Sequence, residues 1–262
     1  MTKISSLVSV ALSLLLAAAA IAAAETPDAV ASMRSALAKG DPEAAIAAGE
    51  AATAVPGAGA ETWRWLGDAY CSQAMKASLF SRLGFAHKCQ AAYERAIALD
   101  PTDVESRAAL AEYLSGAPSI AGGDKAKARA QAEEVVKLEP ARGHLLLGGI
   151  YTSEENFTAA TAEFKLAVAA DPGSRDLSAH YQLGKVALLS GKDLAEGAEH
   201  FRAYLDAPPL PGRPTWADAH WRLGLILEKQ GHRDQAIAEI RAALKLNPNH
   251  PLARKDLERL GG

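Results

Sequence analysis

The sequence predicts an all-α protein, a right-handed superhelical α-solenoid of antiparallel helix pairs, and three observations support this fold class. Alanine supplies much of the 49% hydrophobic content while aromatic residues make up only 6%, which favours closely packed helices because alanine is the best helix former. A pattern of small and large residues recurs along most of the chain. Proline follows each recurrence and ends it, since proline cannot continue a helix. Recurrence of this kind indicates stacked helical units.

The N-terminal segment, residues 1–24, is typical of a secretory signal peptide. Lys3 precedes a run from Ile4 to Ala24 that contains only apolar residues and four serines. Because Ala22 and Ala24 are small enough for a signal peptidase, we expect cleavage after Ala24 and a soluble, exported protein in the periplasm. The run also approaches the length that spans a bilayer, about 20 residues. The alternative is therefore an uncleaved helix that tethers the protein to a membrane, although the absence of stop-transfer charges favours cleavage.

The next segment, residues 25–59, is expected to form a degenerate helix pair at the N-terminal end of the stack. Alanine-rich stretches lie on both sides of Lys39–Pro42, where a glycine and a proline predict the hairpin. Terminal units of repeat stacks are atypical because one of their faces meets solvent. This pair is therefore expected to act as a cap.

The clear repeats begin at residue 60. Residues 63–70 read W-R-W-L-G-D-A-Y, and the leucine–glycine pair recurs at Gly148, Gly184 and Gly224. Each of these three glycines lies 24 positions before a proline. The second halves of the units share a small residue, a large residue and an alanine at constant spacing. These patterns resemble the tetratricopeptide repeat, in which a small residue lets two helices approach closely and large residues fill the space around them.

The resemblance implies five repeats and a closing helix. The interval from the central small residue to the final proline is 34 positions in the first clear repeat and 29 in the second, so these two carry insertions. Hairpin tips tolerate such insertions. The expected repeats are residues 60–101, 104–140, 141–172, 177–208 and 217–248, followed by a C-terminal capping helix within 249–262.

The two cysteines of the chain, Cys71 and Cys89, fall on opposite helices of the first clear repeat. If the hairpin turns near residues 81–84, both cysteines lie at similar distances from the turn, and an oxidising compartment favours a disulfide between them. The alternative is a pair of separate core thiols, since Cys89 occupies a site where the repeat places a small buried residue. A redox enzyme would need a C-x-x-C pair, which the sequence lacks.

Three histidines occupy the same repeat position, four residues before the central glycine: His144, His180 and His220. Equivalent sites in adjacent helix pairs lie about 10 Å apart, whereas zinc needs its ligand nitrogens at about 2.0–2.1 Å. One ion cannot be shared along this row, so we expect half-buried packing histidines. The sequence predicts no metal site and no cofactor.

No catalytic motif stands out. The loop Gly116–Ala126 places glycines before a lysine and a helix, but Asp124 and Ala126 occupy positions where a phosphate-binding loop needs glycine and a hydroxyl. Asp124 is instead expected to cap a helix from Lys125 to Leu138. We predict no catalytic residues and a protein that is not an enzyme.

The resemblance implies that the first helix of each pair lines a concave groove. Residues three before, one after and four or five after the central glycine point into this groove in tetratricopeptide proteins. In the C-terminal repeats these positions are aromatic, apolar and basic, typical of a surface that receives a partner's helix or extended segment. The alternative for Tyr181 and Trp221 is that they pack between helices. The predicted partner-binding residues are Arg142, Tyr181, Lys185, Leu188, Trp221, Leu225 and Lys229.

These observations predict a non-enzymatic scaffold that binds a protein or peptide partner in its groove. The formal charge of −3 gives no strong field, so neither nucleic acid nor an anionic membrane surface is an expected partner, and the oligomeric state stays open. The alternatives are a membrane-tethered assembly factor that keeps its N-terminal helix, and a small-ligand binder or enzyme.

Overall fold

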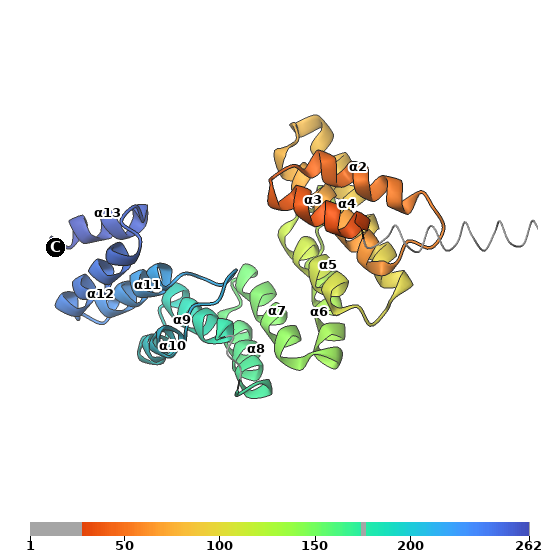
Figure 1. The fold of residues 1–262 in the computed structure, drawn as a ribbon. Coiled ribbons are helices and arrows are strands. Elements are labelled where there is room, and N and C mark those ends of the chain that lie inside the picture. The colour runs from red at the N-terminus through yellow and green to blue at the C-terminus, as the bar shows by residue number, and fades with distance from the viewer. Residues whose placement is uncertain (1–27, 174–176, 262) are drawn as a thin grey trace, which may run out of the picture. The chain divides into compact units, whose positions relative to one another are not determined.

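The computed structural model describes residues 28–173 and 177–261, so the expected signal peptide and its cleavage site lie outside the described residues. Within these two ranges every regular element is a helix and no strand occurs (Figure 1). The predicted all-α stack of antiparallel helix pairs is confirmed. No helix in these ranges is long and apolar enough to cross a bilayer.

The helices follow one another in pairs joined by short turns. A first helix covers residues 28–38. The elements that follow are α2 (Pro42–Thr53), α3 (Ala60–Lys76), α4 (Leu79–Leu99), α5 (Val104–Gly116), the short 3-10 helix η1 (Ser119–Ala121), α6 (Lys125–Leu138), α7 (Pro140–Ser153), α8 (Phe157–Ala170), α9 (Ser178–Ser190), α10 (Leu194–Asp206), α11 (Trp216–Lys229), α12 (Arg233–Leu246) and α13 (Pro251–Arg259).

The chain divides after Leu138 into two compact units. In the first unit, α3 packs against α4 and α5 against α6, and α2 lies against α3. In the second unit, α7 pairs with α8, α9 with α10 and α11 with α12, while α13 packs on α12. Within each unit the second helix of one pair also contacts the first helix of the next pair. Each repeat is therefore stabilised mainly by its neighbours in sequence.

Each central glycine lies against the large residue of the second helix in its own repeat. A methyl group on Gly148 would lie 2.4 Å from the nearest ring atom of Phe164, closer than carbon atoms can approach. Hydrogen at this position therefore sets the distance between the two helices. The four such pairs are Gly67 with Tyr93, Gly148 with Phe164, Gly184 with Phe201, and Gly224 with Ile240.

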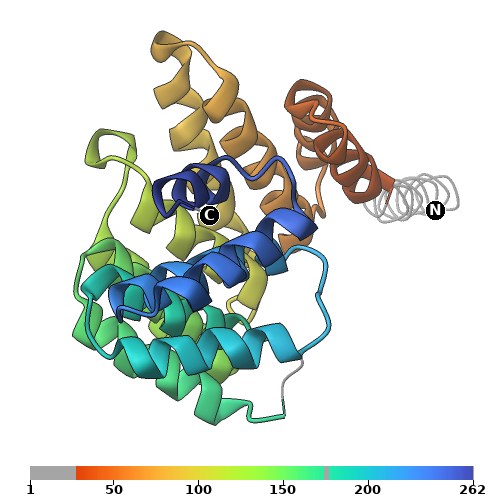
Figure 2. The same cartoon turned by 90° about the vertical axis from the view of Figure 1, so that its left-hand side faces the viewer.

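The insertion in the first clear repeat lengthens both helices of the hairpin. α3 has 17 residues and α4 has 21, and the chain turns at Ala77 and Ser78, which are extended. The expected turn at residues 81–84 is wrong, because these residues lie inside α4. Glycine is tolerated within a helix at a cost of about 1 kcal/mol, so Gly84 does not end one. Figure 2 shows this hairpin extending beyond α5 and α6, which follow it in the chain.

The insertion in the second repeat forms the loop between α5 and α6, which contains η1. Asp124 ends this loop, and its Oδ1 accepts hydrogen bonds from the backbone N–H groups of Ala126 (3.0 Å) and Lys127 (3.1 Å). The predicted cap of the helix Lys125–Leu138 is confirmed. A side chain on Gly123 would collide with the Ala117 carbonyl oxygen, so this glycine allows the loop to close on itself.

Candidate functional site

The candidate site lies on α9 and α11, the first helices of two successive repeats in the second unit. The two helices contact each other. Thr215 begins α11 by accepting a hydrogen bond from the Asp218 N–H at 3.1 Å, and Gly191 ends α9 in the left-handed conformation. The caps fix where each helix begins and ends, and so which of its side chains face the neighbouring helix.

Three of the predicted partner-binding residues, which were expected to be exposed, are buried. Tyr181 is 6% exposed, Trp221 8% and Leu188 9%. The Tyr181 ring packs against Phe201 and Tyr204 of α10, with centroids 5.5 and 5.2 Å apart. The expected exposure of these side chains is wrong, because all three belong to the hydrophobic core of the second unit. The alternative, packing between helices, describes Tyr181 and Trp221.

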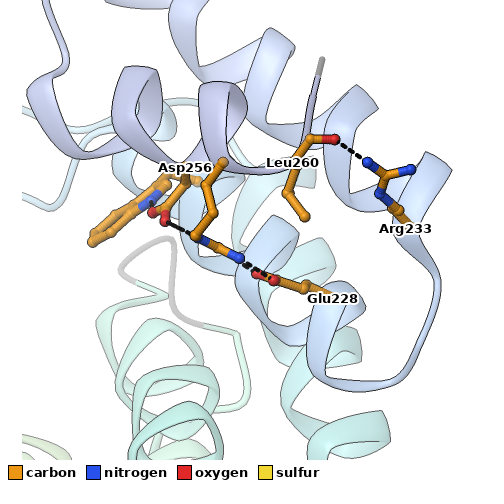
Figure 3. A network of polar contacts seen from close by, with 6 residues as sticks. Glu228, Arg233, Asp256 and Leu260 are labelled. Atoms are coloured by element: carbon orange, nitrogen blue, oxygen red, sulfur yellow. Dashed lines mark hydrogen bonds and ion pairs between the residues drawn. The ribbon is translucent and has the colours of Figure 1, made fainter.

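Trp221 is covered by the C-terminal helix α13. Its indole Nε1 donates a hydrogen bond to Asp256 Oδ2 at 2.8 Å, and its ring lies 5.2 Å from that of His250. Arg259 joins the same Asp256 carboxylate to Glu228 of α11, with a distance of 2.7 Å from Nη2 to Glu228 Oε2 (Figure 3). Arg233 of α12 also donates to the Leu260 carbonyl (Figure 3). These bonds fasten α13 over the indole.

Two cations remain on this face without a carboxylate partner among the described residues, Lys185 of α9 and Arg222 of α11. Both side chains are half-buried. The Arg222 Nε donates to the Tyr181 hydroxyl at 2.8 Å, and its guanidinium lies 5.0 Å from the centre of the Trp221 ring. Burial of the Lys185 amine, and the positive charge of Arg222, lower the pKa of Lys185. An anion placed beside both groups would relieve this repulsion.

The Asp218 carboxylate, which acts on Tyr181, does not neutralise these cations. It bonds to the Thr215 hydroxyl, and its Oδ1 lies 3.3 Å from His250 Nε2. Burial nevertheless raises the pKa of Tyr181 overall, so its hydroxyl stays protonated and can donate. The face therefore offers two positive groups and one hydroxyl.

The other predicted groove residues lie on α11 and α7. Leu225 is half-buried and packs on the core of the second unit. Lys229 is exposed in the last turn of α11. Arg142 belongs to α7, where Glu139 Oε2 lies 3.9 Å from its Nη1. The structure thus gathers Tyr181 and Lys185 around a residue that the sequence analysis did not select, Arg222.

Arg222 was missed because only fixed offsets from the central glycine were considered, and it lies two positions before Gly224. Side chains on a helix lean toward its N-terminus. A long arginine next to a groove position can therefore cover the aromatic residue beside it. Its place between Trp221 and the leucine–glycine pair was the available signal.

The corresponding face of the first unit has its charges paired. Arg64 lies 3.1 Å from Asp68, and the Tyr93 hydroxyl donates to the same carboxylate at 2.7 Å. Burial raises the pKa of Asp68, while the Tyr93 hydrogen bond and the Arg64 charge oppose that rise. Because these groups satisfy one another, the unpaired cations distinguish the face of the second unit.

The three aligned histidines each bond to the second helix of their own repeat. His144 Nδ1 lies 2.7 Å from Glu163 Oε2, and His220 Nδ1 lies 2.6 Å from Glu239 Oε2. In the repeat between them, His180 Nδ1 lies 3.0 Å from a second imidazole nitrogen, His200 Nδ1. No group of three or more metal-binding side chains occurs in the part of the chain that the structure describes.

Cys71 and Cys89 form a disulfide between α3 and α4, with their Cα atoms 5.3 Å apart. The extended hairpin places the two positions opposite each other although its turn is not where the sequence suggested. An oxidising compartment favours such a bond. The disulfide links the C-terminal half of α3 to the middle of α4.

Comparisons with known proteins match two parts of the repeat stack. Tetratricopeptide repeat family models match residues 120–175 and 217–250. No curated protein sequence matches the chain. Many solved structures match it.

Three of the solved structures illustrate the likeness. The chain is similar to PilW, a type IV pilus biogenesis factor, with 19% identity, a TM-score of 0.67 and coverage of 90% of this chain and 98% of that one. It is also similar to PilF of Pseudomonas aeruginosa, with 12% identity, a TM-score of 0.64 and coverage of 91% and 98%. YrrB, described as having an unusual peptide-binding site, has 20% identity, a TM-score of 0.50 and coverage of 72% and 91%. At these identities the likeness concerns the fold alone.

Proposed function

We propose that the chain is a protein-interaction scaffold that binds an acidic segment of a partner protein on α9 and α11. The two matches to tetratricopeptide repeat models support a scaffold role. The observation that carries the proposal is the pair of half-buried cations, Lys185 and Arg222, without a carboxylate partner among the described residues. Partner carboxylates would supply the missing negative charge, through charge-assisted hydrogen bonds. The Tyr181 hydroxyl, which already holds Arg222, would help to orient them.

The apolar surroundings support recognition of a peptide rather than of a free ion. Leu225 is half-buried beside the cations, and Lys229 extends the positive charge along α11. A segment that alternates acidic and apolar side chains would match this surface. We propose that the chain acts as a scaffold and catalyses no reaction.

Peptide binding tests the proposal. A fluorescein-labelled glutamate-rich peptide should bind the purified chain, and its glutamine counterpart should bind at least about tenfold more weakly, the value of one charge-assisted hydrogen bond. Lys185→Gln and Arg222→Gln should each cause a loss of similar size, and binding should weaken with added salt.

Arg202→Gln is the matched control, because Arg202 lies on α10 in an exposed ion pair with Glu199. It should leave the affinity unchanged. Equal affinity for the glutamate and glutamine peptides, or an equal loss in the Arg202 variant, would contradict the proposed site.

For location, we propose the periplasm with cleavage after Ala24. The apolar run before Ala24 and the disulfide in the first unit support export. N-terminal sequencing of the purified protein should give Glu25 as the first residue. A chain that keeps its N-terminal segment and sediments with membranes would instead support a membrane-tethered assembly factor.

A further inference from the structure

The three most exposed large hydrophobic side chains that the structure describes lie on two turns of the first unit. Phe80 is 100% exposed and Met75 83%, and they flank the turn between α3 and α4. Ile120 is 71% exposed and lies in η1, between α5 and α6. These are the same two turns that carry the repeat insertions. The turns of the two longer repeats therefore leave large apolar side chains in contact with solvent.

The two turns form one structured tip. The buried residues Ala74, Ala86 and Ala121 share a small core, which places η1 against the α3–α4 hairpin. The Tyr113 hydroxyl lies 2.9 Å from the Ala86 carbonyl oxygen and also within hydrogen-bonding distance of the Ala121 carbonyl.

The disulfide adds a covalent constraint to this tip. Cys71 lies four residues, or about one helical turn, before Met75. The backbone that bears Met75, Phe80 and Ile120 is therefore constrained. Little of it needs to become ordered when these side chains meet a binding surface.

Basic residues surround this tip. From Ala69 to Tyr93 the chain contains Lys76, Arg82 and Lys88 but no aspartate or glutamate. Glu50 of α2 pairs with Lys88 at 3.2 Å, and Glu43 of α2 accepts a hydrogen bond from Gln73. Further from the turn, Asp68 accepts a hydrogen bond from Tyr93, and Glu94 accepts one from Gln90. Lys76 and Arg82 bond to backbone carbonyls, which leaves their charge uncompensated. The tip is thus positive although the whole chain carries −3.

We infer that the tip formed by Met75, Phe80 and Ile120 inserts into the headgroup region of an anionic phospholipid bilayer. Apolar side chains flanked by lysine and arginine match that boundary, where the rings and alkyl chains leave water while the charges meet lipid phosphates. A protein partner fits less well, since a stable protein interface buries about 800 Å² on each side, and three side chains on two turns provide far less. The expectation that no anionic membrane would be bound rested on the net charge, which hides the local positive charge.

Co-sedimentation with vesicles tests this inference independently of the peptide site, which lies in the other unit. The purified chain should bind vesicles of phosphatidylcholine with phosphatidylglycerol and bind pure phosphatidylcholine vesicles several-fold more weakly. The triple variant Met75→Ser, Phe80→Ser, Ile120→Ser should lose at least tenfold in partitioning. Its Tm should match the wild type, because these side chains are exposed.

A matched control replaces three exposed leucines of the second unit, Leu189, Leu246 and Leu252, with serine. This variant should partition like the wild type, which also shows that the N-terminal segment, common to all variants, does not account for the difference. As a second measurement, Phe80→Trp should show blue-shifted emission with anionic vesicles and quenching by brominated lipids.

The inference would be overturned if the two triple variants partitioned equally, or if vesicles left the emission of the Phe80→Trp variant unchanged. It would also be overturned if the Met75, Phe80 and Ile120 triple variant differed from the wild type in oligomeric mass but not in lipid binding. The last result would identify the tip as a contact between protein chains.

Discussion

His180 and His200 face each other across α9 and α10, with their Nδ1 atoms 3.0 Å apart. One imidazole must donate and the other must accept, so this hydrogen bond requires at least one neutral ring. In the repeats on either side, Glu163 and Glu239 occupy the place of His200 and hold their histidines through a carboxylate. Protonation of both rings would therefore break the bond between His180 and His200.

Stability should fall in mild acid because of this pair. Burial lowers the pKa of both rings, and the nearby His180 lowers that of His200 further. Glu196 lies 3.6 Å from His200 Nε2 and opposes this, but it is shared with Lys165 of α8 at 2.8 Å. The unfolded chain, with histidine pKa near 6.5, then binds more protons than the folded chain. The contribution is fully present above about pH 6.5 and is lost as the pH falls toward the lower folded pKa.

Replacing one ring tests this response. His200→Glu recreates the histidine–glutamate pair of the neighbouring repeats. When the pH is lowered from about 7.5 to about 5.5, the Tm of this variant should fall by a few degrees less than the Tm of the wild type. Glu239→His builds a second histidine pair and should have the opposite effect. Thermal unfolding followed by circular dichroism measures both, and identical pH profiles for the three proteins would rule out the mechanism.

The glycine at the centre of a repeat should not tolerate even one methyl group. Gly148→Ala would press a Cβ into the Phe164 ring, and overpacking of this kind costs roughly 1–3 kcal/mol. Gly149 is the adjacent control, since its Cβ would meet nothing within 4 Å. Gly149→Ala should stabilise the helix by about 0.5–1 kcal/mol. Urea unfolding compares the two, and equal effects would contradict the role of the close approach.

The disulfide should stabilise the first unit. Cys71 and Cys89 are 18 positions apart, and closing a loop of that size is worth roughly 2–4 kcal/mol. The double variant Cys71→Ala, Cys89→Ala should lose stability of this order in urea unfolding without reductant, and the wild type should lose it only when reduced. Two reactive thiols in the unfolded, unreduced wild type would show that the bond does not form.

The attachment of α13 to α11 should depend on the hydrogen bond between Asp256 and Trp221. Asp256→Ala leaves the buried Trp221 Nε1 without its acceptor, at a cost of about 1–3 kcal/mol, and should shift indole emission to longer wavelength as water reaches the ring. Glu258→Ala, an exposed change on the same helix, should alter stability by less than about 0.5 kcal/mol. Urea unfolding and steady-state fluorescence report both effects.

The repeat frame could be predicted from sequence because it depends on local spacing. The distance from Gly148 to Phe164 along the chain is set by two short helices and a tight turn, and the same pattern recurs at Gly184 and Phe201. The turn at Ala77 and Ser78 was harder to place, since Gly84 is a plausible breaker and yet lies inside α4.

The face of α9 and α11 could not be predicted in the same way. Whether Trp221 is exposed depends on α13, which lies 35 positions further along the chain at Asp256. The role of Arg222 depends on reaching Tyr181 in the preceding repeat, 41 positions earlier. The repeat pattern contains no information about such contacts, because it describes each unit by itself.

The contacts between the central glycines and the large residues also define which parts of the chain are interchangeable. Gly148 and Phe164 belong to the same repeat, as do Gly224 and Ile240, so each repeat contains both halves of its own fit. A whole repeat could then be moved into another stack without losing this match. Exchanging α8 for α12 alone would place a branched aliphatic side chain where a flat ring belongs. The module that design or gene duplication can transfer is therefore the helix pair.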